Sequence, residues 1–446
     1  GHYRLVDEFT DRLLFVTKAV FAISEVLEVK RKPEEAAQTL LAYIETYGMQ
    51  AQLGEAYLRL GELEQRRGDI PARFRYHSLG LEATANIPTR YAADQILIDF
   101  VEDYPEFITN YEAAVSLINQ MLDDEEFREK MISDRAFQYQ YFQTEEGLVV
   151  DSSLIQKVVR DRNFRKDLLE KPVDVLGDLR DEYSERLEML VPYQPEAIFA
   201  KLIGAATEPK LVLDLRILMG RELLTGVETI FPLATEQLHE ASPAVMLWRA
   251  KKLRTLNPVS AKALLEVSLE KHPYEPNRYD TMLTIAEIDM DNARAEPSKE
   301  NWEAALAQYQ RVIERFGMRA EDGAPFLAKG EIETKLGTED AAIETLSLIL
   351  RNPEWKGEPQ AKAHLLLGLA YYSKGSYGEA HGFFERIMLG FGGFMEQVAL
   401  AYYWDMKTLE EMNAPEDVTR LLTEFRTRED LKETEGYRLI EENYEL

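Results

Sequence analysis

The amino-acid sequence predicts an all-α protein, an α-solenoid made of stacked antiparallel helix hairpins. Apolar residues recur at steps of three and four along nearly the whole chain, as at Val16, Ala19, Val20 and Ile23, and this is the period of an amphipathic helix. The 446 residues include 24 glycines and 18 prolines, together below the ~12 % of average proteins. A pattern that recurs at a nearly constant step late in the chain indicates tandem repeats.

The composition excludes several classes of function. The chain has no cysteine, which removes thiol catalysis, disulfides, and cysteine-bound zinc or iron–sulfur centres. Its formal net charge of −28 opposes binding to phosphate backbones and anionic lipid, so we expect no nucleic-acid partner. No stretch approaches the ~18 uncharged apolar residues of a membrane span, so we expect no membrane insertion.

Two features bear on the compartment. Cysteine avoidance is typical of proteins that pass through an oxidising bacterial envelope. The sequence begins at Gly1 without an initiator methionine, as after removal of a leader or after engineering of the terminus. Both favour a periplasmic or otherwise exported location, and a cytoplasmic location stays open.

The clearest local pattern lies at residues 363–387, AHLLLGLAYYSKGSYGEAHGFFERI. Gly368 and Ala380 are small where two helices of a hairpin would cross, because a larger side chain would push the helix axes apart. Gly375 can end the first helix in the left-handed conformation. Ser376 and Glu379 have the spacing of a capping box for the second helix.

This segment closely resembles a tetratricopeptide repeat (TPR), a helix hairpin. The matching positions are Leu367, Gly368, Tyr371, Gly375, Tyr377, Ala380, Phe384 and Ile387. Three positions depart from the family pattern: His364 stands where an aromatic residue is usual, Ile387 replaces an alanine, and Gly392 stands where a proline is usual. The resemblance is clearest over residues 240–430 and implies a superhelix that works as a protein-binding scaffold.

The small residue at the predicted helix crossing measures the repeat. Ala342, Ala380 and Val418 are evenly spaced, and we call this spacing the repeat step. The spacing from Ala305 to Ala342 is one residue shorter than the repeat step, and the spacing from Ala261 to Ala305 is longer than the repeat step. Polar residues that precede second helices are expected to cap them: Asn257, Ser298, Thr338 and Asn413. Pro273 and Pro353 are expected to end helices.

Three regions are expected along the chain: N-terminal TPR-like repeats at 1–100, a divergent helical region at 101–205, and a C-terminal TPR array with a capping helix at 206–446. A weak repeat in the first region carries Leu60, Gly61, Gly68, Asp69 and Ala72. In the second, Phe127 and Arg128 recur as Phe164 and Arg165, at the spacing of Ala305 and Ala342, and the apolar run 148–150 is expected to enter a helix. Pro192, Pro195 and Pro209 predict a bend or boundary.

Few residues of the sequence are candidates for catalysis or metal binding. His364 and His381 could approach each other across one hairpin, either to share a metal ion or, as we expect, for packing and hydrogen bonding. With 80 acidic residues, carboxylate pairs suited to glycoside hydrolysis are unavoidable, and we assign them to a solvated surface. The sequence therefore predicts no catalytic residue, no cofactor and no metal site.

The function predicted is a non-enzymatic scaffold or adaptor that binds a protein or peptide in its concave groove, in bacterial cell-envelope assembly, secretion or motility. The TPR pattern implies a groove lined by Lys362, Leu365, Leu369, Tyr372, Ser373, Tyr403 and Lys407. Such a wall suits a peptide with apolar anchors and an acidic group. Alternatively, Tyr372 and Tyr403 are core residues. A glycan-binding envelope lipoprotein and an enzyme with a central site are the other classes, and the oligomeric state stays open.

Overall fold

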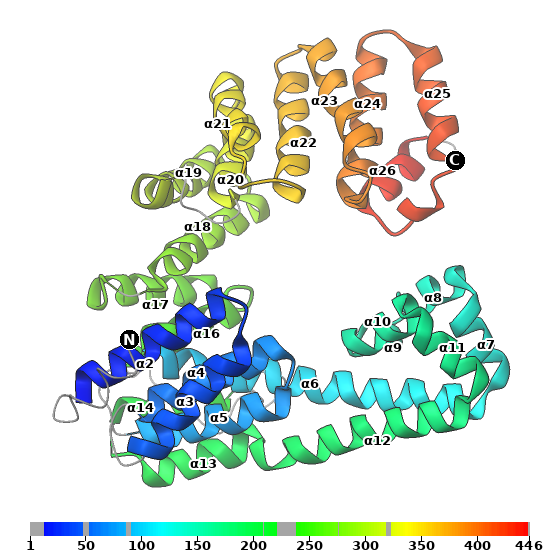
Figure 1. The fold of residues 1–446 in the computed structure, drawn as a ribbon. Coiled ribbons are helices and arrows are strands. Elements are labelled where there is room, and N and C mark those ends of the chain that lie inside the picture. Colours follow the sequence, from blue (N-terminus) through cyan, green and yellow to red (C-terminus); the bar gives the residue numbers. More distant parts are fainter. Residues whose placement is uncertain are drawn as a thin grey trace. The chain divides into compact units, whose positions relative to one another are not determined.

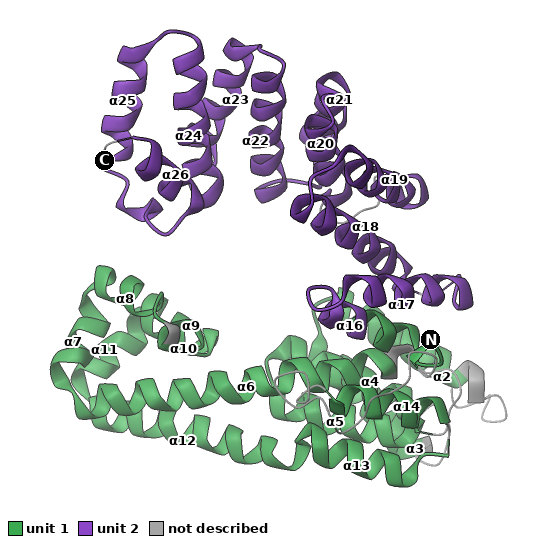
Figure 2. Cartoon of the chain, turned by 180° about the vertical axis from the view of Figure 1, so that it is seen from behind, with its two compact units in different colours: residues 1–248 green, residues 249–446 purple. Residues whose placement is uncertain are grey.

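The computed structural model describes residues 13–47, 53–85, 91–207, 209–220, 238–274, 276–317 and 323–444. These residues form helices and contain no strand, so the all-α prediction is confirmed, with the run 148–150 at the end of a short helix. None of the described helices combines the length and the apolar run that crossing a bilayer requires. The chain divides into two compact units, 1–248 and 249–446 (Figure 2). The three expected regions stay a prediction.

The described part of unit 1 begins with four helices and continues with a long pair and its connecting helices (Figure 1). Its helices are α2 (Leu13–Val29), α3 (Pro33–Tyr47), α4 (Leu53–Arg67), α5 (Ile70–Thr84), α6 (Tyr91–Asp123), α7 (Glu125–Ser133), α8 (Arg135–Tyr141), α9 (Glu145–Leu148), α10 (Ser152–Arg160), α11 (Arg162–Glu170), α12 (Pro172–Leu190), η1 (Val191–Tyr193), α13 (Pro195–Ala205) and α14 (Pro209–Met219), and its boundary falls within α16 (Pro243–Leu253). Near the three prolines the helices η1, α13 and α14 follow one another, whereas the boundary between the two units comes later, after Trp248, so a bend at the prolines stays a prediction.

Helices α4 and α5 form the hairpin that the weak N-terminal repeat predicts. A methyl group added to Gly61 on α4 would overlap the ring of His77 on α5, so the two helices cross closely at this point. Gly68 ends α4 with φ +80°, and the Asp69 carboxylate accepts the N–H of Ala72 at 3.0 Å to cap α5. One apolar cluster joins this hairpin to α2 and α3.

Five short helices, α7 to α11, connect α6 to α12, which packs back along α6 (Figure 1). Four of them begin at an aspartate whose carboxylate accepts free backbone N–H groups: Asp124, Asp134, Asp151 and Asp161. The recurring Phe127–Arg128 and Phe164–Arg165 pairs lie at the same positions of two such helices. Arg128 and Arg165 each donate from Nη1 to a carbonyl just before their own helix, at 2.8 and 2.7 Å. This recurrence in the sequence therefore repeats a local structure.

Unit 2 is a series of helix pairs that follow one another along the chain (Figure 2). After α16 its elements are α17 (Pro258–Lys271), α18 (Arg278–Ala295), α19 (Lys299–Phe316), α20 (Ala324–Lys335), α21 (Glu339–Arg351), α22 (Glu358–Ser373), α23 (Tyr377–Gly390), α24 (Met395–Glu411), α25 (Pro415–Phe425), η4 (Glu429–Leu431) and α26 (Glu435–Asn443). From α17 to α25 each helix packs on the next, and the first helices α20, α22 and α24 also pack on one another in order. This is the predicted stack of antiparallel hairpins.

The repeat register is confirmed where the helices of each hairpin cross. A methyl group added to Gly330 would overlap Leu346, and one added to Gly368 would overlap the ring of Phe384. The small residues used to measure the repeat are Ala261, Ala305, Ala342 and Ala380, all 0 % exposed, and the half-buried Val418. Each glycine crossing thus depends on a missing side chain on one helix and a large one at a constant spacing on the next.

The turns inside successive hairpins share one backbone geometry. Gly337, Gly375 and Asn413, which follow one another at the repeat step, have φ of +72°, +79° and +56°. The next residue then donates its N–H to a carbonyl of the preceding helix, at 2.9 Å in all three turns: Thr338 to Glu333, Ser376 to Tyr371 and Ala414 to Leu409. This pattern satisfies the last carbonyls of the first helix.

Two of the expected N-caps are confirmed. The side chains of Asn257 and Ser298 each accept the backbone N–H three residues further on, at 3.0 and 3.1 Å. The helices before Pro273 and Pro353 also end as expected, two residues ahead of each proline.

The other expected caps are wrong, including the capping box of Ser376 and Glu379. Ser376 makes no side-chain cap hydrogen bond, the Thr338 hydroxyl donates to a carbonyl of α20, and Asn413 ends α24 in the left-handed conformation. An N-cap oxygen reaches the helix N–H groups best from an extended backbone. The tight turn holds ψ at 56° for Thr338 and 67° for Ser376, below the 79° and 159° of the confirmed caps Asn257 and Ser298, and their short hydroxyl side chains make no bond to these N–H groups.

We expect Gly375→Ala to lower the free energy of unfolding of unit 2 by ~1 kcal/mol, since the left-handed conformation disfavours a Cβ. A Cβ there would meet no atom within 4 Å, so the cost is that of the backbone alone. Gly382→Ala is the matched control: its Cβ also meets nothing, but it lies inside α23, where alanine should stabilise by ~0.5–1 kcal/mol. If the urea midpoints of both variants shifted in the same direction from that of the unmodified chain, the turn geometry would be contradicted.

Candidate functional site

The residues predicted to line a groove lie on two first helices, α22 and α24. Lys407 on α24 follows Leu369 on α22 by one repeat step, and by the same step Glu410 matches Tyr372. Because α22 and α24 pack on each other, these equivalent positions are neighbours across the two helices. The register therefore adds Glu410 to the predicted set.

Aromatic rings connect α22 to α24 at this point. The ring of Tyr372 meets that of Trp404 with a centroid separation of 5.5 Å, and Trp404 meets Tyr403 at 5.3 Å. Lys407 places its Nζ 6.0 Å from the centre of the Tyr403 ring and 3.1 Å from Oε2 of Glu410. We name these five residues, Tyr372, Tyr403, Trp404, Lys407 and Glu410, the aromatic–lysine cluster.

A sixth side chain, Tyr444 from beyond α26, lies against the cluster. Its hydroxyl donates to Oε1 of Glu410 at 2.9 Å, and Nζ of Lys407 lies 5.0 Å from its ring centre. Burial, with the bond to Glu410, raises the pKa of the Tyr444 hydroxyl, and burial, with the nearby charge of Glu411, raises the pKa of Tyr372. Both phenols therefore stay neutral hydrogen-bond donors near neutral pH.

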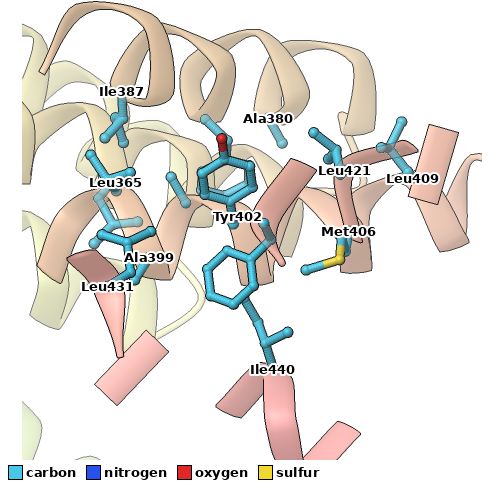
Figure 3. Packing of buried hydrophobic residues seen from close by; sticks show 14 residues of the cluster. Leu365, Ala380, Ile387, Ala399, Tyr402, Met406, Leu409, Leu421, Leu431 and Ile440 are labelled. Carbon is cyan, nitrogen blue, oxygen red and sulfur yellow. The ribbon is translucent and has the colours of Figure 1, made fainter. Parts of the chain in front are cut away.

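The other predicted groove residues are not brought into this cluster. Leu365 is only 9 % exposed and belongs to the apolar core shown in Figure 3, against which Leu369 packs. Lys362 is exposed and pairs at 2.7 Å with Glu358 on its own helix. Ser373 is exposed at the end of α22.

The two tyrosines at issue combine packing with exposure. Tyr402, 1 % exposed, is the core tyrosine of α24 (Figure 3), and burial, with its bond to Glu424, raises its pKa to about 12. Tyr372 and Tyr403 are half-buried and pack on the edge of the same core. Each ring therefore keeps part of its surface exposed, while the rest supports the hairpin stack.

Sequence reasoning missed three members of the site. Glu410 could have been found, because it follows Tyr372 by one repeat. Trp404 is not among the predicted groove residues, because its contact with Tyr372 depends on how α22 and α24 pack. Tyr444 reaches the cluster from a separate helix, and no spacing rule predicts that.

His364 and His381 each have a separate partner. Nδ1 of His364 lies 2.8 Å from the carbonyl oxygen of Gln360, and Nδ1 of His381 lies 2.7 Å from a carboxylate oxygen of Asp405. Asp405 is fully buried, and burial raises its pKa to about 6 although His381 opposes the shift. In the part of the chain that the structure describes, no group of three or more acidic or histidine side chains is placed to hold a metal ion.

Comparison with known proteins gives little further information. No family model matches the sequence, and no curated protein is significantly similar to it. Among solved structures, the chain is similar to the crystal structure of the TPR domain of P58(IPK), with 12 % identity over 92 % of this chain and 99 % of that one and a TM-score of 0.23. A likeness at this level supports no argument about function, which has to come from the site itself.

Proposed function

We propose that this chain is a non-enzymatic scaffold that binds a peptide segment of a partner protein at the aromatic–lysine cluster of unit 2. The observation that carries the proposal is the joining of half-buried rings on two packed helices, beside a cation and a carboxylate. Aromatic side chains supply most of the binding energy at protein interfaces. Lys407 balances the charge of Glu410, 3.1 Å away, at the place where a peptide would anchor on a chain of net charge −28.

The absence of cysteine supports placing this activity in the bacterial envelope, in assembly, secretion or motility. Aromatic rings beside a carboxylate also suit a sugar, so a glycan is the second candidate ligand. Both ligands would bind to the same rings. A competition experiment distinguishes them, because a soluble oligosaccharide would displace a glycan ligand but not a peptide ligand.

The test is a selection of peptides from a random display library on the full chain, followed by measurement of their affinity for the double variant Tyr372→Ala/Tyr403→Ala. We expect affinity to fall by at least about tenfold, which corresponds to ~1.4 kcal/mol. The melting temperature should fall only by a few degrees, since both rings lie at the edge of the core.

Tyr274→Ala is the matched control, because Tyr274 is 94 % exposed and outside the cluster. Its affinity for the selected peptides and its melting temperature should equal those of the unmodified chain. A double variant that melts much lower yet binds the selected peptides normally in the cold would show that Tyr372 and Tyr403 serve only packing.

A further inference from the structure

Tyr444 is held at the aromatic–lysine cluster by side-chain contacts that a tyrosine from another chain could reproduce. Its backbone is extended, with φ −135° and ψ 148°, and its ring and hydroxyl reach Lys407 and Glu410 on α24, far earlier in the chain. One ring over an ammonium group and one hydrogen bond to a carboxylate are weak contacts when they are partly exposed. Tyr444 also packs against the edge of the apolar core, and its backbone N–H donates to the carbonyl of Ile440 at 2.8 Å, so an incoming tyrosine would replace its ring and hydroxyl and not its backbone.

The helix that carries Tyr444 is anchored elsewhere. A methyl group added to Gly436 would overlap the backbone of α24 at Ala399 and Leu400, and Ile440 is 0 % exposed. Thr434 caps the start of the helix by accepting the N–H of Tyr437 at 3.1 Å. Since these contacts lie in α26 itself, α26 can stay in place when Tyr444 leaves the cluster.

Space beside the cluster is open. Glu410 also lines a hollow at the turn between α24 and α25, together with Asn413, Pro415, Val418 and Thr419. A peptide whose side chain replaced that of Tyr444 would have this hollow for its neighbouring residues.

We infer that Lys407 and Glu410, with the rings of Tyr372, Tyr403 and Trp404, form a subsite for a tyrosine of the partner peptide, and that Tyr444 fills this subsite within the chain until the partner's tyrosine replaces it. This inference rests on the proposed function and adds the anchor residue and its competitor. The hydroxyl must donate to Glu410, so phenylalanine binds less well. Phosphotyrosine is excluded, because its phosphate brings negative charge to that carboxylate.

The test uses fluorine NMR of the full chain, in which the four tryptophans are replaced by fluorotryptophan. The signal of Trp404 is the one that disappears in the variant Trp404→Phe. The probe is a capped pentapeptide with the sequence of residues 442–446, Glu-Asn-Tyr-Glu-Leu, and its phenylalanine and phosphotyrosine versions. We expect the tyrosine peptide to shift the Trp404 signal of Tyr444→Ala with a dissociation constant at least about tenfold lower than for the unmodified chain. The phenylalanine peptide should bind several-fold more weakly and the phosphopeptide not at all.

Asn443→Ala is the matched control, since it changes the neighbouring exposed residue and leaves Tyr444 in place; it should behave as the unmodified chain. Hydrogen exchange of α26 verifies that Tyr444→Ala keeps this helix. Equal binding to both chains, or no shift of Trp404 in Tyr444→Ala, overturns the inference. Library peptides that bind the unmodified chain and Tyr444→Ala equally, yet lose affinity for the Tyr372/Tyr403 double variant, would overturn the tyrosine exchange and leave the proposed function standing.

Discussion

Ala380→Arg is expected to lower the free energy of unfolding of unit 2 by ~3 kcal/mol or more, from overpacking and an unpaired buried charge. Ala380 is 0 % exposed and belongs to the apolar core of Figure 3, together with Leu365 and Phe384. Phe384 already fills the crossing, since even a methyl group on Gly368 would overlap its ring. A long charged side chain therefore has to separate α22 from α23 or stay buried without water.

The matched control is Glu379→Arg, which introduces the same side chain one position earlier, where the residue is exposed. Because Glu379 forms no capping box, this change should stay within ~0.5 kcal/mol of the unmodified chain. Urea midpoints of the two variants provide the comparison. Similar midpoints would show that the repeat register is misplaced.

The α4–α5 hairpin of unit 1 shows which contacts a buried arginine needs at the position equivalent to Ala380. Arg73 follows Gly61 in the α4–α5 hairpin at the same spacing as Ala380 follows Gly368, and it is 1 % exposed. Helix α6 supplies its partners, with Asp103 at 2.7 Å and Asp99 at 3.5 Å from Nη2. The ring centres of Phe74 and Phe107 lie 5.2 and 5.9 Å from its guanidinium carbon.

The sequence predicts those features of the fold in which a residue acts on its own backbone or on a residue at a constant spacing. Gly375 and Gly337 take the left-handed conformation because of their own missing Cβ. Gly368 and Phe384 meet because a turn of fixed length brings the chain back across the hairpin. Such rules recur at every repeat step, and for this reason they are readable in a single sequence.

Other features depend on neighbours that spacing does not identify. The hydroxyls of Ser376 and Thr338 fail as caps because the left-handed residue before each holds the backbone away from the extended conformation. Arg73 breaks the small-residue rule, since the helix that pairs with it lies outside the repeat. The candidate site is only partly predictable for the same reason: Tyr403 and Lys407 follow from the register, whereas Tyr444 arrives from a different helix.

His77 is a second residue at which the α4–α5 hairpin differs from its counterparts in unit 2. Leu346 and Phe384 stand at the equivalent position after the crossing glycine, while His77 is 1 % exposed and packed on Gly61. Burial and then the charge of Arg73 lower its pKa to about 3. The ring is therefore neutral in the folded chain and titrates near its ordinary value of ~6.5 only when the chain unfolds.

The contribution of His77 to stability should consequently fall as the pH drops, because below pH ~6.5 the imidazole of the unfolded chain binds a proton that the folded chain excludes. Between pH 7 and pH 5 this costs ~2 kcal/mol, and the loss grows until the pH nears 3. In His77→Leu the loss should disappear, while stability at pH 7 changes little, since leucine already occupies the equivalent crossing at residue 346. Hydrogen exchange of the α5 amides at both pH values, corrected for the intrinsic exchange rate, measures the difference. An equal pH dependence in the variant and the unmodified chain would mean that His77 accepts its proton without opening the hairpin.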